Sequence, residues 1–91
     1  MNKAIISVIG KDCVGIIGRI CTFLADAGVN IEDISQTILQ GYFTMMMVVD
    51  ISGMKMGFDE AAAALSAIGE EIGGLVIKMQ HEDIFNTMHR I

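Results

Sequence analysis

Residues 4–31 read AIISVIGKDCVGIIGRICTFLADAGVNI and decide the fold, because they contain a strand, a loop, a helix and the start of another strand. Residues 4–9 are apolar and β-branched, which favours a strand that Gly10 ends. The apolar side chains of residues 15–27 recur along one helical face: Ile16, Ile17, Ile20, Cys21, Leu24 and Ala27. Gly28 then stands where a left-handed C-terminal cap is expected.

The rest of the chain adds a hairpin, a second helix and a last strand. Residues 29–39 predict a strand whose alternation weakens around Asp33, and Gln40-Gly41 is a tight hairpin signal before a strand over 42–51. Helical spacing over 58–72 predicts a second helix with acids in its first turn, and a strand over 75–80 follows. Residues 82–91 carry a short amphipathic stripe.

This order, βαββαβ, predicts an α+β fold of the ferredoxin-like type, with a four-stranded antiparallel sheet and both long helices on one face. We expect one domain over residues 1–91, with a core over 3–80 and a C-terminal helix over 82–91. The strand over 42–51 has a core-facing set, whereas its opposite face is mixed. The set is Phe43, Met45, Met47, Val49 and Ile51. That open face needs a cover, which the C-terminal helix of the same chain or of a partner subunit could provide.

Composition limits the partners of the chain. Hydrophobic residues make up 53% and charged residues 19% of the 91 residues, which predicts a homodimer or larger homo-oligomer that hides apolar surface. The net charge of −5 gives no basic footprint for direct nucleic-acid binding. No apolar run approaches the length of a membrane span, and no leader is visible, so we expect a cytoplasmic chain without membrane contact.

The loop between the first strand and the first helix is the best candidate site. A helix N-terminus offers unpaired N–H groups to an anion, and Gly15 lets the backbone approach a ligand closely. Asp12 could receive an ammonium group, and Asn30 could both donate and accept hydrogen bonds. The alternative is that the glycines only turn the chain and that Asp12 is an N-terminal cap.

The stretch KDCVGIIGRICTFLADAGVNIEDISQ, residues 11–36, resembles the core of an ACT domain. The family pattern is an acidic residue before a basic residue, proline and glycine, followed by two apolar residues and a later G-x-N-I. The chain matches this pattern at these positions: Asp12, Gly15, Ile16, Ile17, Gly28, Asn30 and Ile31. The resemblance covers about residues 3–80. It is strongest to short bacterial and archaeal proteins of a single ACT domain, and it extends to one half of the glycine-cleavage regulator.

The resemblance implies a regulatory module that binds an amino acid or similar small molecule where two domains meet. It implies a site at the loop and the start of the second strand: Asp12, Cys13, Val14, Gly15, Ile16, Asn30 and Ile31. The family's basic residue and proline are replaced by Cys13 and Val14, so we expect these two positions to decide the ligand preference. A chain without an enzyme domain would act on a separate partner; the alternative is a ligand-free dimerisation module.

Other chemistry is weakly supported. Cys13 before a helix N-terminus could be a reactive thiol, but no resolving cysteine is near in sequence. His81 and His89 are eight residues apart, which suits surface histidines better than a metal site. Met45-Met46-Met47 alternates across a strand and is better explained as core filling. We therefore expect no enzyme activity, no cofactor and no metal.

Overall fold

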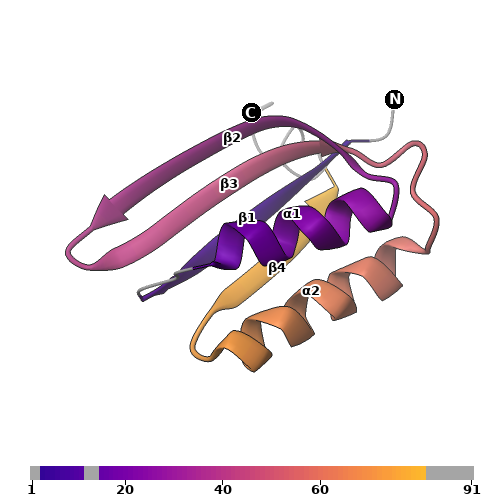
Figure 1. Ribbon diagram of the computed structural model, residues 1–91. Helices are drawn as coiled ribbons and strands as arrows, with labels where there is room; N and C mark the ends of the chain where they lie inside the picture. The colour runs from indigo at the N-terminus through magenta and orange to yellow at the C-terminus, as the bar shows by residue number, and fades with distance from the viewer. Residues whose placement is uncertain (1–2, 12–14, 82–91) are drawn as a thin grey trace, which may run out of the picture.

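The computed structural model describes residues 3–11 and 15–81 and confirms the predicted fold class. The elements follow in the order β1 (Lys3–Lys11), α1 (Ile16–Asp26), β2 (Asn30–Leu39), β3 (Tyr42–Asp50), α2 (Phe58–Ile72) and β4 (Val76–His81). The strands form one sheet in the order β2-β3-β1-β4, and each neighbouring pair is antiparallel. Both helices lie on the same face of this sheet (Figure 1). The helix predicted over 82–91 lies outside the described residues.

The core lies between the sheet and the two helices. Residues of β1 and β3 alternate between buried and more exposed positions, as a sheet covered on one face requires. The largest fully buried side chains in this core come from β1, α1, β3 and α2: Ile6, Val8, Ile16, Ile20, Leu24, Met45, Met47, Val49 and Leu65. The core-facing set predicted for β3 is therefore confirmed, and Met46 points to the opposite face of the sheet.

The prediction that Gly10 ends the first strand is wrong. β1 continues to Lys11, and Gly10 pairs with Phe43 of β3. The reason for a glycine here is a close approach across the core, because a Cβ atom at Gly10 would lie 2.1 Å from Cδ2 of Leu75. Leu75 is buried, so the space beside Gly10 is already occupied.

The hairpin and the irregular second strand have simple geometric causes. Gln40 and Gly41 both have positive φ, at 51° and 83°, which matches the twist of a two-residue hairpin turn. The register of β2 against β3 shifts between Ile31 and Asp33, so Glu32 is the extra residue of a β-bulge. This bulge explains why the alternation of the sequence weakens around Asp33.

The turn after α1 holds the start of β2 against the loop after β3. Gly28 has φ 79° and ends α1 in a Schellman motif, in which the N–H of Val29 donates to Leu24 and that of Gly28 donates to Ala25. The N–H of Lys55 donates to the carbonyl of Ala27 at 2.8 Å. The predicted left-handed cap at Gly28 is therefore confirmed.

We predict that Gly28→Ala destabilises the protein more than Gly15→Ala. Both glycines have φ near 80°, where an added Cβ costs about 1–2 kcal/mol. At Gly15 no described atom lies within 4 Å of that Cβ, whereas at Gly28 the carbonyl oxygen of Gly53 would lie 2.7 Å away. The crowding adds about 1–3 kcal/mol to the loss at Gly28. Urea denaturation of both variants measures the difference, and equal losses would show that the contact with Gly53 is unimportant.

Candidate functional site

A glycine holds the N-cap position of α1. The N-cap residue is Gly15, in the left-handed region, and no side chain among residues 3–11 and 15–81 caps the helix there. The helix begins at Ile16, so Gly15 holds the N-cap position. Asp12 lies outside the described residues, and its interpretation as a helix cap stays a prediction. The first turn contains no acidic residue. The positive end of the helix dipole and its first N–H groups are thus left without an acid from their own turn.

The predicted site residues that the structure describes differ in how far they are exposed to solvent. Gly15 is exposed, whereas the side chain of Ile16 is fully buried in the core. Ile16 could therefore meet a ligand only through its backbone. Asp12, Cys13 and Val14 lie outside the described residues.

Asn30 and Ile31 lie at the other end of the sheet from Gly15. Asn30 pairs with Asp50, which pairs with Lys3 at the start of β1. Gly15 instead follows the opposite end of β1, and the 11 residues of α1, about 16 Å long, separate it from the start of β2 (Figure 1). One chain therefore does not bring the two halves of the predicted site together.

A shallow open hollow of about 570 Å³ lies between α1 and α2. Its lining residues are Gly15, Gly18, Arg19, Thr22, Phe23, Asp26 and Ile68. The guanidinium of Arg19 is paired with the carboxylate of Glu71 across the two helices, and both side chains are largely exposed. Among the predicted site residues that the structure describes, Gly15 lines this hollow, whereas Asn30 and Ile31 do not.

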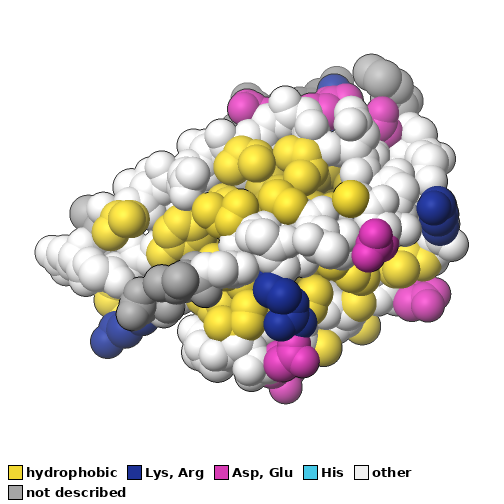
Figure 2. All heavy atoms as spheres, in the orientation of Figure 1, with side chains coloured by type: hydrophobic (Ala, Val, Ile, Leu, Met, Phe, Trp, Pro, Cys, Tyr) yellow, Lys and Arg dark blue, Asp and Glu magenta, His cyan; other side chains and the backbone are white. Residues whose placement is uncertain are grey.

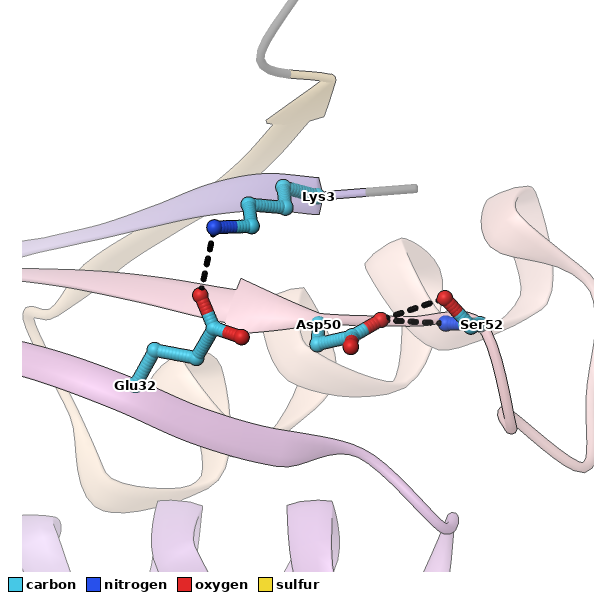
Figure 3. A network of polar contacts seen from close by, with 4 residues as sticks. All are labelled: Lys3, Glu32, Asp50 and Ser52. Carbon is cyan, nitrogen blue, oxygen red and sulfur yellow. Dashed lines mark hydrogen bonds and ion pairs between the residues drawn. The ribbon is translucent and has the colours of Figure 1, made fainter. Parts of the chain in front are cut away.

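A polar cluster of Lys3, Glu32, Asp50 and Ser52 lies at the far end of the sheet (Figure 3). Asn30 is its neighbour, because it pairs with Asp50. Lys3 of β1 forms an ion pair with Glu32 in the bulge of β2, with 2.8 Å between Nζ and Oε1. The hydroxyl and the backbone N–H of Ser52 donate to Oδ1 of Asp50, at 2.5 and 2.9 Å. These two hydrogen bonds, the hydroxyl first, hold the pKa of Asp50 below its usual value of 3.8, with a smaller contribution from Lys3.

β2 also exposes apolar side chains that were not among the predicted site residues. Ile34 is 40% exposed and Ile38 is 75% exposed, although their register with Met47 and Phe43 places them on the helix side of the sheet. β2 is an edge strand of the described sheet. Hydrophobic side chains gather beside α1 along the β2–β3 hairpin (Figure 2). The even spacing of Ile34 and Ile38 along a predicted strand was the sequence signal that these two side chains share one face.

The other candidate residues that the structure describes have packing roles. His81 stacks on Phe58, with ring centroids 4.1 Å apart and planes 12° from parallel. Cys21 packs against the core and is partly buried, as expected of a core cysteine. Within residues 3–11 and 15–81, no three side chains of His, Cys, Asp or Glu converge as metal ligands would. Nor is any helix in these ranges long and apolar enough to cross a membrane.

Comparison with known proteins identifies the family. A family model described as an ACT domain matches residues 2–78, so the chain belongs to the ACT domain family, whose members are generally regulatory modules that bind small molecules. A UPF0237 protein of Bifidobacterium longum is 52% identical over 91 residues and is covered over its full length, as is this chain. This alignment includes residues 82–91, whereas the family model ends before them.

Solved structures agree with this assignment. An ACT domain protein from Streptococcus pneumoniae is 43% identical, with a TM-score of 0.80 over 92% of this chain and 93% of that one. A protein described as a glycine cleavage system transcriptional repressor has a TM-score of 0.71 over 88% of this chain and 45% of that one. At 22% identity the second likeness shows the fold alone, and it confirms the predicted similarity to about one half of that protein.

We predict that Ser52→Ala raises the pKa of Asp50 toward 3.8, because the variant lacks the hydroxyl donor. A carboxylate with a lowered pKa stabilises the folded state fully above pH 3.8, and the stabilisation is lost as the pH falls through the lower, folded-state pKa. The stability difference between the native protein and Ser52→Ala should therefore shrink at acid pH. NMR titration of the Asp50 carboxyl carbon measures the shift, and Ser66→Ala on α2 is the control. An unchanged Asp50 titration in Ser52→Ala would contradict the assignment.

Proposed function

We propose that this chain is a regulatory module that binds a small ligand, an amino acid by preference, between two copies of itself and acts on a separate partner. The observation that carries the proposal is the separation of Gly15 and Asn30 at opposite ends of the sheet, together with an edge strand that exposes apolar side chains. A second copy can join the two halves. The family membership supports the small-molecule and regulatory parts of the proposal.

The symmetry of strand pairing explains how a second copy would join the halves. Two β2 strands that pair in antiparallel fashion about a two-fold axis place the start of one beside the end of the other. The end of β2 lies at the same end of the sheet as Lys11 and the N-terminus of α1, since Leu39 pairs with Tyr42 and Tyr42 pairs with Lys11. Asn30 of one chain would then lie at the same end of the joint sheet as Gly15 of its partner. The dimer would hold two such sites.

Burial supports the same arrangement. Ile34 and Ile38 lie on the helix side of β2, where the helices of the same chain leave them exposed. A partner joined at the β2 edge would cover them with its own β2 and α1. This agrees with a chain in which 53% of the residues are hydrophobic.

The chemistry of the two halves suits an amino acid. The N–H groups at the start of α1 suit a carboxylate. Asp12 would accept hydrogen bonds from an ammonium group, and Asn30 of the partner would fix its orientation. Cys13 and Val14 would stand beside the ligand side chain and select it. The role proposed is regulatory rather than catalytic, without nucleic acid or membrane, and with the cytoplasm as the expected location.

A ligand that binds the folded protein should raise its melting temperature. At a hundredfold excess over Kd the expected stabilisation is about 2.7 kcal/mol, or roughly 10 °C or more for a domain of this size. A thermal-shift screen of the full chain against the twenty amino acids measures it. Asp12→Ala and Asn30→Ala should each reduce the shift, whereas Ser66→Ala should not.

The screen also separates the two candidate functions. If no amino acid at millimolar concentration changes the melting temperature, the amino-acid proposal is wrong, and the exposed β2 edge favours a ligand-free interaction module. If a shift survives both Asp12→Ala and Asn30→Ala, the ligand binds elsewhere and the site assignment is wrong.

We predict that Ile38→Glu weakens self-association at least about tenfold, because the proposed interface would bury an unpaired carboxylate. Sedimentation velocity over a range of concentrations measures the change. Ala63→Glu is the matched control, since Ala63 is exposed on α2 away from the β2 edge. Equal association of the two variants would place the interface elsewhere.

A further inference from the structure

The sheet face opposite the helices carries a row of apolar side chains. It includes Ile5 and Ile9 of β1, Met46 and Val48 of β3, and Val76 of β4. Ile9, Met46 and Val76 are 48%, 42% and 53% exposed. The strand register places Ile5 beside Val48 and Ile9 beside Val76, and Met46 lies between these two pairs, beside Ser7. Neither helix covers this face (Figure 1).

The same face carries charges of both signs, because Asp33 pairs with Val48, and Asp50 pairs with Lys3. Lys78 is exposed on it, beside Ser7 and between the apolar residues at either end of the row. Lys11 also lies on this face, with its Nζ 5.2 Å from the ring centroid of Tyr42. An amphipathic segment whose acids can approach Lys78 would therefore match both the apolar row and the lysine within it.

Residues 82–91, EDIFNTMHRI, have these properties and begin beside the row. They follow His81, which pairs with Ala4, the neighbour of Ile5. Two acids, Glu82 and Asp83, come first, and the apolar residues follow at helical spacing: Ile84, Phe85, Met88 and Ile91. A ten-residue helix is about 15 Å long, and the row from Ile5 to Ile9 is about 13 Å long.

We propose that residues 82–91 form a helix that turns back after β4 and covers the open face of their own chain. Ile84 and Phe85 would pack near Ile5 and Val48, and Ile91 would lie toward the Val76 end of the row. Glu82 and Asp83 would stand at the helix N-terminus, which favours acids, within the field of Lys78. With this face covered, the β2 edge would be the apolar surface left for assembly, so copies would associate edge to edge rather than face to face.

A single tryptophan tests this cover, because the chain has none of its own. In Phe85→Trp, the fluorescence emission should lie at shorter wavelength than that of a synthetic 82–91 peptide with the same substitution. Adding Ile9→Glu or Val76→Glu should shift it back to longer wavelength, and adding Ala63→Glu on α2 should not. Circular dichroism shows whether each variant is folded, and having two sheet-face variants keeps the test valid if one of them is not.

Two outcomes would overturn the proposal. One is a Phe85→Trp variant whose emission equals that of the peptide, or does not respond to either charge on the sheet face. The other is a blue shift that disappears on dilution, which would mean that the segment covers a second copy instead of its own chain.

A matched pair of segment variants gives an independent measurement. Phe85→Asp should increase the binding of an apolar dye such as anilinonaphthalene sulfonate, because it would uncover the row on the sheet. Thr87→Asp adds the same charge to the polar side of the segment and should leave dye binding unchanged. Equal dye binding by the two variants would show that the apolar stripe of the segment has no contact with the sheet.

Discussion

The pairing of β1 with β3 is the interaction on which the other elements depend. Ala4, Ile6 and Val8 of β1, and their neighbours Met45, Met47 and Val49 of β3, have no exposed surface. Because side chains alternate across a strand, a slip of one residue would turn this whole set away from the helices. The apolar pattern thus holds one register, and that register fixes where α1 begins and which strands become the edges.

The sheet order that follows has a direct consequence for binding. α1 starts at one end of the sheet and returns the chain to the other end, so the two halves of the predicted site cannot meet within one chain. A ligand that bridges two chains stabilises their association by mass action. In the proposed arrangement, ligand binding and assembly would therefore be coupled without any change in the fold of either chain, and this coupling would supply the regulatory signal.

The two apolar surfaces of the molecule differ in what they can accept. The β2 edge presents unpaired backbone groups together with Ile34 and Ile38, so it suits another strand with a covering helix. The open face presents a flat row of side chains with Lys78 among them, so it suits an amphipathic helix. In these proposals, another copy of the chain covers the β2 edge, and residues 82–91 cover the open face. Each surface then has a partner of matching geometry.

Much of this structure could be predicted from short stretches of sequence. The order of elements, the cap at Gly28, the Gln40-Gly41 hairpin and the buried set of β3 depend on periodicity or on local backbone preference, and the structure confirms them. The prediction that failed concerns a residue whose surroundings are set by a distant part of the chain. Gly10 does not end β1, because the strand continues to Lys11 and Gly10 makes room for Leu75.

The sequence by itself determined the fold class, the family resemblance and the residues of the candidate site, because these reside in residue types and their spacing along the chain. Only the tertiary structure decided where those residues lie. It buried the side chain of Ile16, set Asn30 far from Gly15 and exposed Ile34 and Ile38 at an edge. Spacing along the chain cannot show this, because proximity, burial and edges arise from strand pairing between segments that are remote in sequence.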